Sequence, residues 1–243
     1  MLVYMLSDPL PQKSNGQVAQ ARVEQLIDKM WKTLNAPAWF AAEGAEWTFR
    51  NQHHYLWHKR LGRVRVDLNP SLSVYIEPHT GRGRAFMRGE PLDASDQSKY
   101  IAQAIKAFHN DSFWLAAPFK VRDPGTHRSL VSDAEGEGVL VYYKTGGTTP
   151  GDRYLWRLGK NDQPKSWQLW VKIIPVQGMI FTWEDWRPSS SGALIAHHHR
   201  SKILDITLQK IKVTRTFTEL ASGDPHLTSP QWESLMSGAP LTR

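Results

Sequence analysis

The sequence predicts an α+β protein, mainly β, in which two helices cover a strongly curved antiparallel sheet of about 10 to 12 strands. Most of the chain alternates apolar and polar residues with a period of two and breaks at turn residues, as half-buried strands do. Short, turn-rich connections favour a meander over β-α-β units. Because strand twist accumulates, a sheet this wide curls into an incomplete barrel whose concave face needs cover.

The first helix is predicted over residues 17–35, because apolar residues recur there at helical spacing. Asn15 or Ser14 can accept backbone N–H groups at its start, and Asn35 and Pro37 mark its end. The residues of its apolar face are Val23, Leu26, Ile27, Met30, Trp31 and Leu34.

A second helix is predicted over residues 96–109, with Ser95 or Asp96 as its cap. It repeats the same spacing, so both helices need an apolar surface to lie on. Its apolar face consists of Tyr100, Ile101, Ala104, Ile105 and Phe108.

No Pro/Ser-rich linker and no repeat divides the chain, so a single domain is predicted over residues 1–221, followed by a loosely attached tail over residues 222–243. The predicted strands are Glu46–Phe49, His53–His58, Val64–Asp67, Leu72–Glu77, Gly83–Arg88, His127–Val131, Val139–Lys144, Tyr154–Leu158, Ser166–Ile174, Met179–Trp186, Ala193–His199 and Ile203–Thr214.

The chain of 243 residues has no cysteine, which excludes a disulfide framework, a thiolate zinc site and an iron–sulfur cluster. No metal site or cofactor is predicted, since His197 and His199 on one strand face are only half of a zinc site. The longest apolar run, Phe113–Phe119, is too short to cross a bilayer. No signal peptide is visible at the start of the sequence.

Thirty Lys and Arg against 23 Asp and Glu give a net charge of +7, which favours an anionic partner such as a membrane surface. Specific nucleic-acid binding is not expected, because the basic residues are scattered and no five of them are consecutive.

Four stretches carry a resemblance to known proteins: Asn110–Gly125 (NDSFWLAAPFKVRDPG), Tyr142–Trp156 (YYKTGGTTPGDRYLW), Pro164–Trp186 (PKSWQLWVKIIPVQGMIFTWEDW) and Ser191–Ala193. Together they resemble a bacterial family of largely uncharacterised proteins with the fold of the lipoprotein-sorting carriers, the LolA/LolB-like group. The resemblance covers roughly Trp47 to Val213. It implies an incomplete barrel with helices over its mouth and a cavity for acyl chains. It also implies the periplasm or cell envelope, while the lack of a visible signal leaves the cytoplasm open.

The function expected is therefore that of a binding or carrier protein for a lipid, a lipoprotein acyl chain or another hydrophobic ligand. Aromatic side chains of the concave face and of the segment after the second helix are expected to hold it, and arginines at the rim to attract an anionic headgroup. The ligand-binding candidates are Trp57, Phe113, Trp114, Leu115, Phe119, Trp156, Trp170 and Trp183. The rim candidates are Arg63, Arg65, Arg82 and Arg84.

Two alternatives stay open. One is a cofactor-independent enzyme that uses the same cavity, with His109, Asp111, Asp123 and His127 as weak acid–base candidates, for example His109 with Asp123 or His127 with Asp111. The other is a basic protein that binds an anionic surface or a nucleic acid. The sequence leaves the oligomeric state open.

Overall fold

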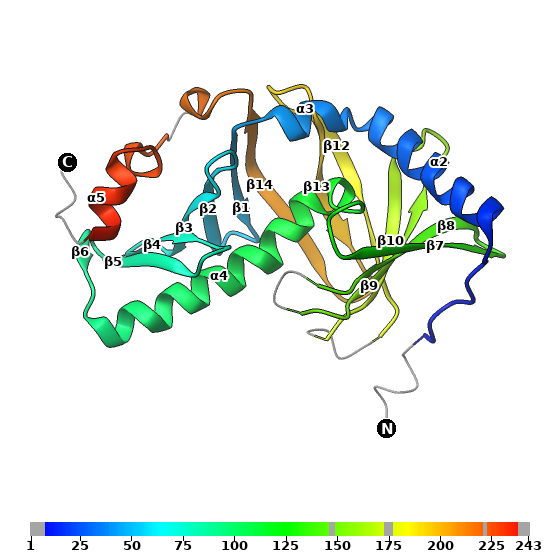
Figure 1. Cartoon of the computed structure of the whole chain (residues 1–243), viewed down its shortest axis with the longest axis horizontal. Helices are drawn as coiled ribbons and strands as arrows, with labels where there is room; N and C mark the ends of the chain where they lie inside the picture. Colours follow the sequence, from blue (N-terminus) through cyan, green and yellow to red (C-terminus); the bar gives the residue numbers. More distant parts are fainter. Residues whose placement is uncertain (1–7, 146–148, 173–176, 221–222, 238–243) are drawn as a thin grey trace. The chain divides into compact units, whose positions relative to one another are not determined.

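The computed structural model describes residues 8–145, 149–172, 177–220 and 223–237 of the chain (Figure 1). Antiparallel sheets and helices make it an α+β protein, mainly β, which confirms the predicted fold class at this level. The chain forms two compact units. The first unit is built from residues 1–37, 115–187 and 194–206, and the second from residues 38–114, 188–193 and 207–243.

The first unit is a five-stranded antiparallel meander covered by α2 (Gln17–Thr33) (Figure 1). The predicted helix is thus confirmed, with an end two residues earlier. The sheet runs in the order β11-β10-β9-β8-β7. Its strands are β7 (Thr126–Asp133), β8 (Gly136–Tyr143), β9 (Arg153–Leu158), β10 (Pro164–Trp170) and β11 (Met179–Thr182). The next two strands along the chain, β12 (Glu184–Pro188) and β13 (Leu194–Arg200), belong to the second sheet.

Backbone geometry rather than a side-chain cap limits α2. Gly16, at φ 98°, precedes its first turn, and no side chain caps it. The N–H of Ser14 bonds the carbonyl of Leu130 on β7, so the predicted cap is used as a sheet contact. At the other end Asn35 adopts a left-handed φ of 51°, which ends the helix as predicted.

A second antiparallel sheet runs in the order β12-β13-β14-β1-β2-β3-β4-β5-β6, and in the second unit α4 (Ala94–Ala116) lies across its strands (Figure 1). The non-sequential neighbour is β14, which pairs with β1. The remaining strands of this sheet are β1 (Gly44–Phe49), β2 (His53–His58), β3 (Arg63–Asn69), β4 (Leu72–Glu77), β5 (Arg82–Met87), β6 (Glu90–Pro91) and β14 (Asp205–Thr214), and α3 (Ala36–Ala41) precedes β1.

The second helix is longer at both ends than the predicted residues 96–109. Asp93, not Ser95 or Asp96, caps it: its Oδ1 accepts the N–H of Asp96 at 3.0 Å. Gly83 lets α4 approach β5, since a Cβ there would lie 3.0 Å from Ile101. None of the helices in the described ranges has both the length and the apolar character needed to cross a bilayer.

The described part of the tail, residues 223–237, packs against strands β3 and β5 of the second unit's sheet. It contains η3 (Pro225–Leu227) and α5 (Gln231–Ser237), and both Leu227 and Trp232 are fully buried. These apolar side chains join Tyr75 and Phe86 in one hydrophobic cluster. Residues 222 and 238–243 of the predicted tail lie outside the described residues.

Candidate functional site

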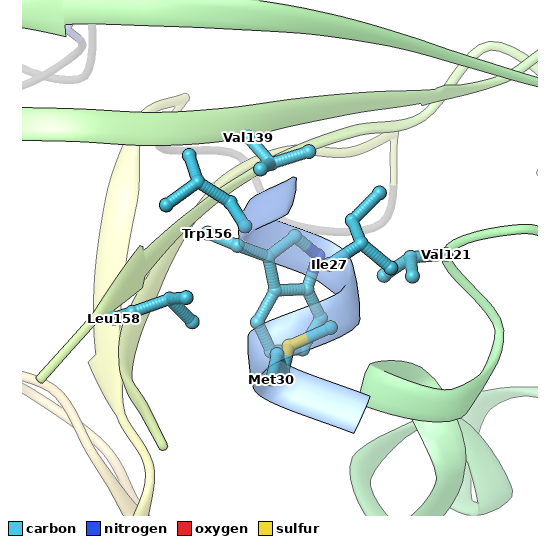
Figure 2. Close-up of a pocket in the computed structure, with 7 residues that line it drawn as sticks. Ile27, Met30, Val121, Val139, Trp156 and Leu158 are labelled. Carbon is cyan, nitrogen blue, oxygen red and sulfur yellow. The ribbon is translucent and has the colours of Figure 1, made fainter. Parts of the chain in front are cut away.

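A small apolar cavity lies beneath α2 in the first unit (Figure 2). Its volume is about 10 Å³, the space of one water molecule. The apolar stripe of α2 forms one wall, and β8, β9 and the segment before β7 form the other. The lining residues are Leu26, Ile27, Met30, Val121, Val139, Trp156 and Leu158, which offer one polar hydrogen-bonding group among them, the indole N–H of Trp156.

Polar links fasten α2 along its flanks rather than through the cavity. Arg22 donates to Glu137 at 2.7 Å and 2.9 Å, and this pairing holds the pKa of Glu137 below its usual value. Arg122 donates to Glu24 and Asp28 at 2.7 Å each. Because Glu137, Glu24 and Asp28 are all at least one-third exposed, water can replace these partners if the helix moves.

Two hydrogen bonds and one cation–π contact hold the C-terminal half of α2. The indole N–H of Trp31 donates to the carbonyl of Pro118 at 2.9 Å, and the Arg122 guanidinium lies 4.7 Å from the Trp31 ring centroid. Thr33 donates to the carbonyl of Asn161 at 3.2 Å. All these groups lie at the edge of the helix, so its underside remains apolar.

A cluster of tryptophans extends the apolar floor beyond the cavity. The ring of Trp156 lies 5.0 Å from that of Trp167 and 5.2 Å from that of Trp183, centroid to centroid. All three side chains are at most 3 % exposed. Their tilted and edge-on packing gives the sheet under α2 a rigid aromatic surface.

The structure brings few of the predicted ligand-binding residues together. Of the eight, Trp156 lines the cavity, and the ring of Trp183 packs against the ring of Trp156. Trp170 instead joins Val131, Leu140 and Leu155 in a separate cluster. Leu115 and Phe119 are buried in the first unit. Trp57, Phe113 and Trp114 belong to the second unit, where the Trp57 ring packs 5.3 Å from Phe108.

The other six lining residues were not predicted as ligand-binding. Leu26, Ile27 and Met30 had a visible signal, since they form the apolar stripe that predicts α2. Val139 and Leu158 had a weaker signal, the alternation of their strands. Seven of the eight predicted ligand-binding residues are aromatic, and the aliphatic wall that faces Trp156 is not among them.

The four predicted rim arginines do not line this cavity; they share one face of the second unit's sheet. In the strand register, Tyr75 on β4 lies opposite Arg65 on β3 and opposite Arg84 on β5. Glu77 on β4 lies opposite Arg82 on β5. Three of the arginines have carboxylate partners. Arg65 bonds Asp67 at 2.9 Å and Asp224 at 3.1 Å, Arg82 bonds Glu233 at 3.2 Å, and Arg63 lies 3.8 Å from Glu77. Their charge is thus largely met within the unit.

Asp111, one of the weak acid–base candidates, is the buried centre of a polar cluster under α4. Its Oδ2 accepts the hydroxyl of Tyr55 at 2.6 Å and lies 2.8 Å from Nδ1 of His53. Its Oδ1 accepts the side-chain amide of Asn110 at 2.8 Å. Burial, together with the nearby Asp111 carboxylate, raises the pKa of Tyr55 well above its usual value, so the phenol stays protonated and donates.

The other acid–base candidates have ordinary surroundings. Asp123 forms an ion pair with Lys120, three residues earlier in the chain. The ring of His127 stacks 6.1 Å from Tyr142, and that of His109 lies 6.1 Å from Phe108. Within the described ranges no group of three or more His, Asp or Glu side chains is placed to hold a metal ion.

No protein-family model and no curated protein matches the chain.

Proposed function

We propose that the protein binds a lipid, a lipoprotein acyl chain or another hydrophobic ligand beneath α2 of the first unit. The supporting observation is an amphipathic helix whose underside faces a cavity lined by apolar side chains and one indole, while its polar links lie at its flanks. Burial of acyl surface there would contribute about 25 cal/mol per Å². The proposal includes the curved half-barrel fold, a place in the cell envelope and contact with an anionic membrane surface.

The cavity of about 10 Å³ is far smaller than an acyl chain, so binding requires α2 to move away from the sheet. Such a movement exposes aliphatic and aromatic side chains, which the ligand then covers. The flank ion pairs limit the movement, and because they are partly exposed, their loss costs little. The proposal therefore describes the structure as the closed form of a ligand-binding unit.

Cross-linking α2 to the sheet tests this proposal. The chain has no cysteine, so the double variant Arg22→Cys/Glu137→Cys introduces the only thiols. A bifunctional methanethiosulfonate with a short alkyl spacer then bridges α2 and β8, and a reductant releases it. Uptake of a pyrene-labelled acyl methyl ester is followed by fluorescence before cross-linking, after it and after reduction.

We expect uptake to fall at least about tenfold on cross-linking and to return on reduction. The matched control is His198→Cys/Asp205→Cys, which replaces an ion pair of the same unit outside the α2 links. Unchanged uptake with α2 bridged, or no uptake by the wild-type protein, would overturn the proposal.

A second candidate, the cofactor-independent enzyme, is favoured by the pair of His53 and Asp111. A buried carboxylate at one imidazole nitrogen orients the ring and leaves the other nitrogen as a base. Hydrolysis of a p-nitrophenyl acyl ester by the wild-type protein, lost in His53→Ala, would support this candidate. Equal rates for both proteins would remove it.

A further inference from the structure

The indole N–H of Trp156 is a buried donor at the proposed ligand site. The residue is 1 % exposed, and its Nε1 has no hydrogen-bond partner among the described residues. Figure 2 shows the ring extending from β9 toward Ile27 and Val121, both of which line the cavity. A buried N–H without an acceptor costs free energy, so an acceptor placed here gains more than it would in water.

Water is a poor acceptor at this position. A buried water molecule is held by two to four polar partners as a rule. Here the seven lining residues offer one N–H donor, and the remaining contacts are hydrocarbon or thioether. The acceptor that fits is therefore an oxygen carried on an apolar molecule.

A charged acceptor fits equally badly. The lining includes no Lys, Arg or His, so an ionised carboxylate or phosphate here would lack a counter-charge in an apolar environment. A plain hydrocarbon fills the space but leaves the N–H without a partner. A neutral carbonyl within an acyl ligand meets both requirements, because one oxygen accepts the N–H and the chains on either side of it stay in apolar contact.

We propose that the site beneath α2 selects neutral acyl esters or amides, whose carbonyl oxygen accepts the hydrogen bond from Nε1 of Trp156. This inference rests on the proposed function and narrows its ligand class. The headgroup of such a lipid stays outside the cavity, and the carbonyl marks how deeply the chain enters.

The test compares three ligands of equal chain length: an alkane, a fatty-acid methyl ester and the ionised fatty acid at pH 8. Each is delivered from cyclodextrin, and binding is measured by native mass spectrometry. For the wild-type protein we expect the ester to bind about 3- to 10-fold more tightly than the alkane, and the ionised acid more weakly than either. In Trp156→Phe the ester and the alkane should bind equally.

Trp47→Phe is the matched control, since Trp47 is also fully buried and its Nε1 has no partner in the part of the chain that the structure describes, but it belongs to the second unit. It should keep the preference for the ester. In ¹⁵N-labelled wild-type protein, the ester should shift the Trp156 indole resonance downfield and the alkane should not, a readout that needs no variant to fold.

Two outcomes separate the claims. If the alkane and the ester bind the wild-type protein equally, the ester inference is wrong and the proposed function stands. If none of the three binds, both are wrong. A preference that persists in Trp156→Phe would also overturn the inference.

Discussion

Each unit covers an antiparallel meander with one long helix, but the two helices are attached in different ways. α2 contacts its sheet through an apolar underside and carries its polar links at exposed flanks. α4 has polar links in its buried face. Asp111 bonds Tyr55 and His53, and the Gln97 side chain exchanges two hydrogen bonds with the backbone of Ala85, at 2.7 Å and 3.0 Å.

The difference indicates which helix can move. Displacing α4 would leave a buried carboxylate and a buried phenol without partners, and such groups are costly in an apolar interior. Displacing α2 would expose hydrocarbon and return charged groups to water, where they are well solvated. A ligand that covers the hydrocarbon can offset this cost, so α2 is the helix suited to cover a binding site.

The largest effect is expected when the buried hydrogen bonds of Asp111 on α4 are removed. Asp111→Ala leaves Tyr55 and His53 without their shared acceptor, so the free energy of unfolding should fall by about 3 kcal/mol. Urea unfolding measures this change. Asp111→Asn is the matched control, because its amide oxygen still accepts one hydrogen bond, and it should lose about half as much. A loss under about 1 kcal/mol for the alanine variant would mean that Asp111 does not anchor the helix.

The next largest effect concerns the apolar underside of α2. Ile27→Ala removes a side chain that is 1 % exposed and lines the cavity, so it should cost about 2 to 3 kcal/mol and enlarge the cavity. Val18→Ala, on the same helix but 86 % exposed, should change stability by less than about 0.5 kcal/mol.

The enlarged cavity of Ile27→Ala also tests whether the ligand binds beneath α2. An acyl methyl ester should raise the melting temperature of Ile27→Ala more than that of the wild-type protein, because it fills space that the substitution creates. Calorimetry with and without the ester measures this. Equal shifts for the two proteins would place the binding of the ester elsewhere.

Local patterns in the sequence predicted both helices, and one buried polar residue explains the main error. The apolar spacing of Ala104 and Phe108 continues to Leu115, but Asp111 takes the buried position between them. A carboxylate at this position interrupts the apolar spacing, which predicts the helix only over residues 96–109, whereas α4 continues to Ala116. Its burial depends on His53 and Tyr55, which are more than 50 residues away along the chain.

Contacts between residues far apart in the sequence also explain why the β14–β1 pairing and the ion pairs of the arginines were not predicted. The strand β14 lies beside β1 although about 160 residues separate them, and no local pattern encodes that choice. Arg65 and Arg82 read as free surface charge because Asp224 and Glu233 come 159 and 151 residues later. In the candidate site, Trp156 and the apolar stripe of α2 were both visible, but only folding places one under the other.

A third prediction uses pH to probe the polar character of the second unit. His54 lies between Asp67 and Glu46, at 3.0 Å and 3.1 Å, and the hydrogen bonds that its imidazole donates to these carboxylates raise its pKa from 6.5 to about 9. Arg65 and Lys212 pair with the far sides of the two carboxylates. The protonated imidazole therefore stabilises the fold fully below about pH 6.5, and this contribution is lost as pH rises through about 9.

His54→Gln should cost about 1 to 2 kcal/mol at pH 6 and almost nothing at pH 10, as measured by urea unfolding at each pH. Lys59 acts in the opposite direction, because burial lowers its pKa from 10.5 to about 8, so its contribution rises with pH. The difference between the free energies of unfolding of the wild-type protein and His54→Gln at each pH removes the Lys59 effect, because both proteins contain Lys59. His79→Gln, in the exposed turn before β5, is the control, and a pH-independent loss in His54→Gln would refute the assignment.

The smallest expected effect is at the flank of α2. Arg122→Ala removes two ion pairs and the contact with the Trp31 ring, and should cost about 1 kcal/mol because its partners are partly exposed. Amide hydrogen exchange should quicken across α2 but not across α4, and added salt should produce the same change in the wild-type protein. Arg187→Ala, which breaks an exposed pair with Asp185 in the first unit, should leave α2 exchange unchanged. If salt quickens exchange equally in both helices, the flank ion pairs do not distinguish α2 from α4. The inference that α2 is the helix that moves would then be wrong.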